Sequence, residues 1–145
     1  MNPKKQKKHF FCLALLTICF TVVPVQAEVV VIVAADSPIT SLSKGQVAKI
    51  FLGKSRRFPD GSRAVPLNQS EGSLEREAFY QLVSDKSPTQ IKAHWSKLIF
   101  TGRGQPPREA ADSNAVKRLL ANNGVNISYV GRGALDNSVK VVAIK

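Results

Sequence analysis

The apolar positions of this chain switch between extended runs and helical spacing, beginning with the unbroken β-branched run from Val29 to Val33. A continuous run of this kind is typical of a strand that is buried on both faces of a parallel or mixed sheet. Shorter extended runs at 64–67, 127–130 and 139–144 predict three further strands.

Four other segments carry apolar residues three and four positions apart, which predicts helices. Their predicted starts are Ser43, Ser73, Ser87 and either Asp112 or Ser113. Ser43 and Ser87 are each followed three positions later by glutamine, the pattern of a capping box. We expect Gly53 to end the first helix and Gly124 to end the last. The order β-α-β-α-α-α-β-β, without an internal repeat or linker, indicates one α/β domain with a mixed sheet flanked by helices.

The stretch from Ala64 to Phe79 is the most suggestive one for function. It is expected to run from a short strand through a polar turn at 68–72 into a helix that starts at Ser73. The first backbone N–H groups of a helix have no partner within it, and small anions often bind there. The alternative is that Ser73 only caps the helix, which is the commoner role for a serine in this place.

The first 27 residues have the pattern of a secretory signal peptide. Four lysines within residues 4–8 precede an apolar run at 10–23, and Val25-Gln26-Ala27 predicts cleavage after Ala27. The apolar run is short for a transmembrane span, and no later stretch is long and apolar enough to be one. We therefore expect a periplasmic protein, residues 28–145, with no membrane span after cleavage. Both cysteines, Cys12 and Cys19, would leave with the signal, so no disulfide or thiolate site is expected.

The predicted mature chain is still basic, since 17 of the 21 Lys and Arg residues remain against 10 acidic ones. In a secreted protein this balance favours anionic solutes, envelope polymers or membrane surfaces over nucleic acid. Three turns hold most of the arginines, a residue type that binds oxyanions through two hydrogen bonds. The basic residues of these turns are Lys54, Arg56, Arg57, Arg63, Arg103, Arg108 and Arg132. A solvated basic rim without a ligand is the alternative.

Little in the sequence indicates catalysis. His94 is the only histidine after residue 27, and no cysteine or nearby acid accompanies it, so we expect it to be a packing or surface residue. No metal-ligand cluster, complete dinucleotide fingerprint or P-loop is present. The sequence therefore predicts a non-enzymatic protein with no metal and no cofactor.

Two motifs nevertheless resemble a known family. The segment from Leu42 to Lys54 is similar to the L-S-x-x-Q-L-x-x-I-F-x-G-K segment of PstS-like phosphate-binding proteins of ABC transporters. The resemblance continues through Val65, the turn 71–73, Phe79 and the strand at 127–130. Trp95 to Pro107 also resembles the W-x-x-L-I-F-T-G-x-G-x-P-P pattern of short, signal-bearing relatives. Together these matches cover nearly all of the predicted mature chain.

The resemblance implies one lobe of a type 2 periplasmic-binding-protein fold, the lobe that carries the family's D-G-S-G-T phosphate loop. Glu71, Gly72 and Ser73 match its acid, glycine and serine, whereas Leu74 and Glu75 replace the following glycine and threonine. Gln69 stands where the family has an arginine. The oxyanion-binding residues expected from this match and from the turn itself are Ser73, Gly72, Gln69, Asn68 and Arg103.

The function implied is weak binding of inorganic phosphate or a similar oxyanion by a solute-binding protein of the phosphate-transporter type. A homodimer or an envelope partner could supply the missing lobe. The alternative is a ligand-free interaction module for an envelope sensor or transporter.

Overall fold

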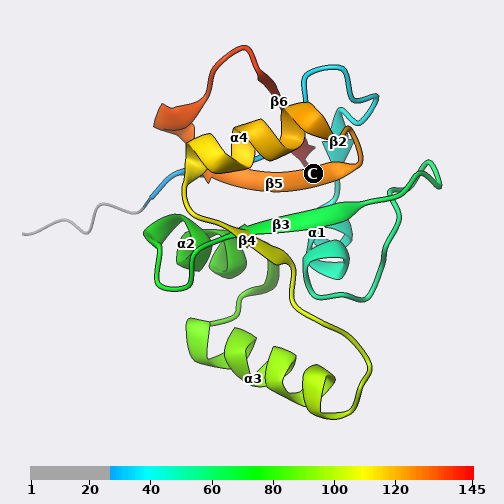
Figure 1. Cartoon of the computed structure of the whole chain (residues 1–145), viewed down its shortest axis with the longest axis vertical. Coiled ribbons are helices and arrows are strands. Elements are labelled where there is room, and N and C mark those ends of the chain that lie inside the picture. The colour runs from blue at the N-terminus through cyan, green and yellow to red at the C-terminus, as the bar shows by residue number, and fades with distance from the viewer. Residues whose placement is uncertain (1–26) are drawn as a thin grey trace, which may run out of the picture.

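The computed structural model describes residues 27–145, so the predicted signal peptide lies, except for Ala27, outside the described residues. The elements are β1 (Val29–Ala34), β2 (Ser41–Leu42), α1 (Lys44–Phe51), β3 (Val65–Gln69), α2 (Leu74–Ser84), α3 (Pro88–Phe100), β4 (Arg108–Ala110), α4 (Ser113–Asn122), β5 (Asn126–Gly131), a 3-10 turn (Arg132–Ala134), β6 (Val139–Val141) and β7 (Ala143–Ile144). Figure 1 shows their arrangement around the sheet.

The main sheet has five strands in the order β4-β3-β5-β1-β6. Strands β4, β3 and β5 run parallel, whereas β1 is antiparallel to both of its neighbours, β5 and β6. The predicted mixed sheet is thus confirmed. A second, two-stranded sheet joins β2 and β7 in parallel.

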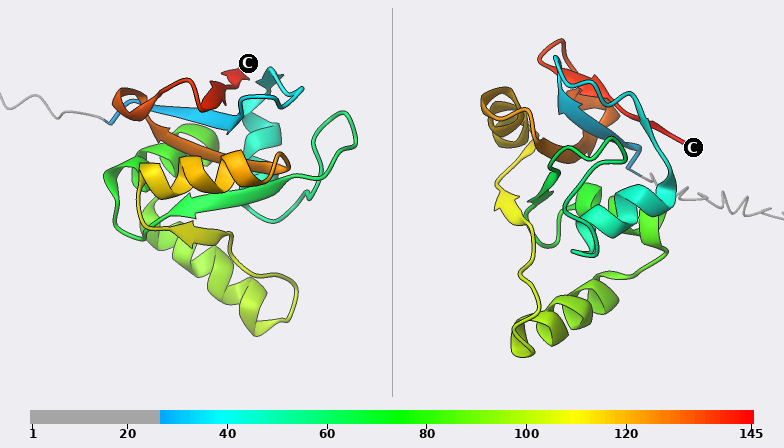
Figure 2. Two further views of the ribbon diagram at one scale, coloured as in Figure 1. Left: turned by 45° about the horizontal axis from the view of Figure 1, so that its top comes forward. Right: turned by 90° about the vertical axis from the view of Figure 1, so that its right-hand side faces the viewer.

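Helices cover the main sheet on both sides. Along β1, Val31 and Val33 enter the larger hydrophobic cluster under α1, α2 and α3, whereas Val30 and Ile32 enter a smaller one under α4. Figure 2 shows α4 on one side of the sheet and α1 with α2 on the other, while α3 extends to one end of the molecule. The alternation explains why β1 is apolar at every position. Residues 28–145 contain every element described and both clusters.

The predicted helix starts are confirmed by their caps. The Ser43 and Ser87 hydroxyls each accept a hydrogen bond from the backbone N–H three residues later, and the glutamine there closes a capping box. Ser73 caps α2 and Asp112 caps α4 in the same way, without the second bond. Gly53 follows α1 with φ +73°, and a Cβ there would lie 2.9 Å from the Trp95 ring.

The structure corrects the sequence prediction in three places. Helix α4 ends at Asn122 with Asn123 as its C-cap, and the glycine after it, Gly124, does not take the left-handed conformation that Gly53 takes after α1. The predicted strand at 139–144 is divided at Val142, whose N–H bonds to the Val31 carbonyl between β6 and β7. Strands β2 and β4 were not predicted, because two or three residues carry too little pattern to be recognised.

A fourth correction affects the candidate site. Asn68 and Gln69 belong to β3, not to the turn that follows it. Parallel pairing with β4 sets Asn68 opposite Glu109 and Gln69 opposite Ala110, and this pairing extends the strand by two residues beyond the predicted end.

Candidate functional site

The carboxyl edge of the sheet, formed by the turns after β3, β4 and β5, presents the start of α2. Gly72 precedes α2 with φ +85°, a conformation that favours glycine, and it is exposed. The Ser73 hydroxyl accepts from Arg76 N at 3.3 Å. Within the described residues, the backbone N–H groups of Leu74 and Glu75 have no hydrogen-bond acceptor. An anion could therefore receive two backbone hydrogen bonds beside Gly72.

Asn68 and Gln69 lie behind this turn, in the interior. Asn68 is 0 % exposed, and its Oδ1 accepts from the hydroxyls of Tyr80 and Tyr129, both at 3.1 Å. The Gln69 amide donates through Nε2 to the Tyr129 carbonyl at 3.1 Å, and its backbone N–H donates to the Tyr129 hydroxyl at 3.2 Å. These side chains therefore hold β3, β5 and α2 together, and their amides do not face solvent as the predicted oxyanion donors would.

Burial raises the pKa of both tyrosines in this network, Tyr80 and Tyr129, above the ordinary value. The cause is the cost of placing a phenolate away from water. Two donors beside the network have no hydrogen-bond partner within residues 27–145, Asn68 Nδ2 and Trp95 Nε1. Burial is the largest influence on the Tyr80 pKa, and the neighbouring Asn68, Arg76 and Trp95 side chains act against it.

Arg76 is a site residue that the sequence prediction missed. Its side chain is 12 % exposed and turns inward, donating to the Gln69 carbonyl at 3.0 Å and pairing with Glu109 of β4. The sequence held one indication of this role. Arg76 comes three residues after the Ser73 cap, and this spacing places it on the first turn of α2, beside the end of β3. Its partner, 33 positions along the chain, could not be inferred locally.

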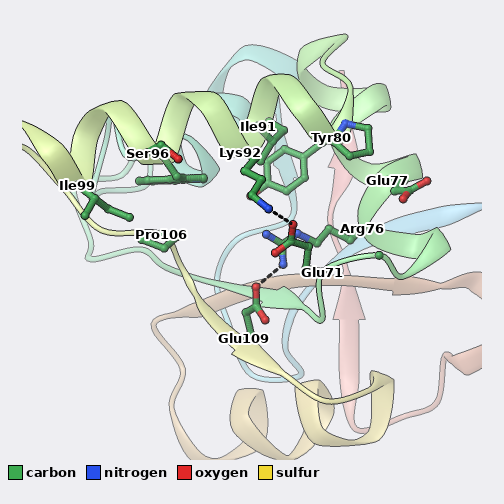
Figure 3. Close-up of a pocket in the computed structure, with 13 residues that line it drawn as sticks. Glu71, Arg76, Glu77, Tyr80, Ile91, Lys92, Ser96, Ile99, Pro106 and Glu109 are labelled. Atoms are coloured by element: carbon green, nitrogen blue, oxygen red, sulfur yellow. Dashed lines mark hydrogen bonds and ion pairs between the residues drawn. The ribbon is translucent and has the colours of Figure 1, made fainter.

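Arg76 and Glu109 also line a pocket between α2, α3 and β4, with a cavity of about 200 Å³. Figure 3 shows Tyr80 and Ile91 in its wall and Lys92 reaching toward Glu71 across its mouth. The distance between Lys92 Nζ and Glu71 Oε1 is 3.7 Å. Gly72 is part of the lining, so the pocket adjoins the α2 start.

Arg103 lies in a different place from the other predicted site residues. It lines a cleft of about 270 Å³ between the loop after α1, the loop after α3 and the start of β4. Arg56, Arg63 and Arg108 line the same cleft, which we call the arginine cleft. The structure thus brings Gly72 and Ser73 together at the surface, places Asn68 and Gln69 beneath them, and sets Arg103 in a separate cleft.

His94 packs as expected, with its Nε2 2.9 Å from the Leu52 carbonyl and its ring edge-on to Trp95. Among residues 27–145, no three His, Cys, Asp or Glu side chains gather as metal ligands would. None of the helices described in that range is long and apolar enough to cross a membrane.

The fold is that of one lobe of a type 2 periplasmic binding protein. Solved structures that share it include a Clostridium perfringens structure described as a phosphate ABC transporter substrate-binding protein with bound phosphate. This chain is 22 % identical to it with a TM-score of 0.62 and covers 44 % of it, using 81 % of its own length. A Vibrio cholerae ABC-type phosphate transport receptor matches with 17 % identity, a TM-score of 0.64, and 81 % and 46 % coverage.

PstS from Borrelia burgdorferi matches with 13 % identity and a TM-score of 0.61, over 81 % of this chain and 47 % of that one. This chain therefore spans less than half the length of each of these structures. No protein-family model matches the sequence, and no curated protein matches it. The likenesses establish the fold.

Proposed function

We propose that this protein is a non-enzymatic, periplasmic solute-binding lobe of the phosphate-receptor type, which binds phosphate or a similar oxyanion at the start of α2. The observation that carries the proposal is the turn of exposed Gly72 and half-buried Ser73 at the carboxyl edge of the parallel strands, where the N–H groups of Leu74 and Glu75 have no acceptor among residues 27–145. Ligands of open α/β sheets bind at this edge. The fold shared with phosphate receptors supports it, and so does the resemblance of Glu71-Gly72-Ser73 to the acid, glycine and serine of the family's phosphate loop.

The expected affinity is low. An exposed helix start favours an anion by about 0.3–1 kcal/mol, and each charge-assisted hydrogen bond adds about 1.5–3 kcal/mol. Association itself costs at least about 4 kcal/mol. A single open lobe should therefore bind phosphate with a Kd on the order of millimolar. A second lobe from another copy of the chain or from an envelope partner would tighten it.

The test is calorimetric titration of residues 28–145, the predicted mature protein, with phosphate, sulfate and small organic phosphates at low salt. Ser73→Ala removes the hydroxyl and loosens the turn, so it should weaken phosphate binding. Ser87→Ala is the matched control, because Ser87 caps α3 in the same geometry away from the site. Equal binding by the wild type and both variants would refute the site assignment. No saturable binding at millimolar phosphate would refute the function.

One observation favours a second candidate, a ligand-free interaction module for an envelope protein. The Glu75 carboxylate lies beside the end of β5. One of its oxygens would be 3.7 Å from a Cβ built on Gly131. This carboxylate sits in the first turn of α2, where it offers negative charge to the helix dipole as an anion would. Glu75→Gln should therefore strengthen phosphate binding if the site accepts phosphate, and should leave the protein unresponsive to phosphate if it is an interaction module.

A further inference from the structure

The arginine cleft differs from the proposed oxyanion site in both position and composition. Its four arginines come from three separate segments: Arg56 and Arg63 from the loop after α1, Arg103 from the loop after α3, and Arg108 from the start of β4. A backbone bond of 2.9 Å from Ala64 N to the Arg56 carbonyl closes the first loop and holds Arg56 beside the base of β3. The fold, and not one basic run of sequence, therefore gathers the charge.

None of these arginines is neutralised within the described residues. No carboxylate of residues 27–145 lies within ion-pair distance of Arg56, Arg63, Arg103 or Arg108, and no acidic residue lines the cleft. All four are exposed. Four uncompensated guanidinium groups around one cleft repel one another, and this arrangement favours a partner with several negative charges.

Part of the cleft lining is apolar. Trp95, Leu98 and Pro66 form part of its lining, and Ile99 lines an adjoining hollow together with Arg56 and Arg103. Ile99 is 55 % exposed and the next residue, Phe100 at the end of α3, is 92 % exposed. Two large apolar side chains side by side in water forgo the free energy that their burial would release. Neighbouring exposed apolar residues of this kind therefore favour a contact surface.

We propose that the arginine cleft and the exposed pair Ile99 and Phe100 dock this protein on an anionic phospholipid surface. Guanidinium groups bind the lipid phosphates in pairs of hydrogen bonds, while Ile99 and Phe100 enter the boundary between headgroups and acyl chains. A soluble polyanion would satisfy the arginines but would leave Ile99 and Phe100 in water. A lipid surface satisfies both observations.

The shape of the molecule permits this contact. In both views of Figure 2, α3 and the loop after it form one end of the molecule, away from the sheet. A flat surface can therefore meet the end of α3, where Ile99 also lines the pocket that adjoins the α2 start. The two proposals rest on different charged groups, because none of the cleft arginines lines the pocket beside the α2 start.

The experiment measures co-sedimentation of residues 28–145 with vesicles of phosphatidylcholine alone or mixed with phosphatidylglycerol. Trp95 is the only tryptophan of the chain and lines both the cleft and the pocket beside the α2 start, so an emission shift reports the cleft only if the cleft variants abolish it. We expect binding to the phosphatidylglycerol vesicles, loss of that binding at high salt, and a shift in Trp95 emission. Replacing one cleft arginine should lower the partition coefficient about fivefold, and Arg56→Gln with Arg103→Gln should lower it about 25-fold.

Phe100→Ser should lower the partition coefficient at least about tenfold. The matched controls are Arg118→Gln on α4, an exposed arginine outside the cleft, and Leu82→Ser on α2, an exposed apolar residue away from α3. Both controls and Ser73→Ala should bind vesicles as the wild type does. No vesicle binding, or an equal loss in Arg118→Gln and in the cleft variants, would overturn the proposal. Tighter binding of soluble polyphosphate that Phe100→Ser leaves intact would also overturn it.

Discussion

The carboxyl edge of the sheet and the arginine cleft use their polar groups in opposite ways. Cations near the carboxyl edge have carboxylate partners: Arg76 pairs with Glu109, Lys117 with Asp136 at 2.6 Å, and Arg132 with Glu28 at 2.7 Å. The cleft arginines have none among residues 27–145.

The difference teaches how to separate structural from functional polarity in this chain. A buried polar group costs stability unless it is hydrogen-bonded, so the partners of Asn68 and Arg76 are required by the fold. An exposed arginine costs little when it is unpaired, so the fold does not require four of them to converge. The convergence of four arginines that the fold does not require is therefore a stronger indication of an external partner than the buried polar groups at the carboxyl edge.

The largest expected effect that tests this contrast is on Asn68. Asn68→Ala leaves the hydroxyls of Tyr80 and Tyr129 without their acceptor in the core, and should lower the free energy of unfolding by about 2–4 kcal/mol. Arg103→Ala should change it by less than about 0.5 kcal/mol, because the side chain is exposed and unpaired. Urea unfolding of both variants measures the difference. Equal losses of unfolding free energy in the two variants would mean that Asn68 is no more important to the fold than a cleft arginine.

The alkaline stability of the protein should depend on the same network. Both tyrosines of the chain have a folded pKa raised above the ordinary 10.0 by burial. A raised folded pKa means that the stability is fully present below pH 10 and is lost as the pH rises above it. The loss should be up to about 1.4 kcal/mol per pH unit for each tyrosine.

Tyrosinate absorbance in native and denatured protein measures this effect. The denatured chain should ionise near pH 10, and the folded chain only as it unfolds. A Tyr80→Phe, Tyr129→Phe double variant should lose the alkaline sensitivity. Free ionisation of both tyrosines near pH 10 in the folded protein would contradict the burial of the network.

The helix caps allow a smaller and more closely matched test. Ser73→Ala and Ser87→Ala each remove a hydroxyl that accepts a hydrogen bond of 3.3 Å from the backbone, and each should cost about 1 kcal/mol. Thermal unfolding with and without phosphate separates capping from binding. Both variants should lose similar stability, and only Ser73→Ala should also lose the stabilisation by phosphate. Equal stabilisation of the wild type and of Ser73→Ala by phosphate would indicate that the role of Ser73 is wholly structural.

Features that depend on residues close together in the sequence could be predicted, whereas features that depend on distant residues could not. The caps at Ser43 and Ser87 and the double-sided burial of β1 depend on neighbouring residues, and the sequence predicted them. The burial of Asn68 depends on Tyr129, 61 positions away, so an asparagine beside a turn was placed in the turn. The convergence of Arg56 with Arg103 depends on the contact of α3 with the residues after α1, where His94 Nε2 lies 2.9 Å from the Leu52 carbonyl, and no local pattern records that contact.

The smallest effect concerns a paired cation at the carboxyl edge, the counterpart of the unpaired arginines. Hydrogen bonds from Lys117, and next from Ser138, lower the pKa of Asp136 from 3.8 to about 2. Because the folded pKa is depressed, this contribution is present above pH 3.8 and is lost as the pH falls toward 2. Lys117→Met keeps the apolar stem and removes the charge, so the pKa of Asp136 should rise. An NMR titration of the carboxyl carbons measures it.

Asp60 is the internal control for this titration. Its pKa is lowered by hydrogen bonds from Ser62 within its own turn, with no cation as a cause, so Lys117→Met should leave it unchanged. If Asp136 titrates near 3.8 in the wild type, the Lys117 pair is not formed in solution. Lys117 would then be as unpaired as the cleft arginines, and only Arg76 and Arg132 would still distinguish the carboxyl edge by pairing.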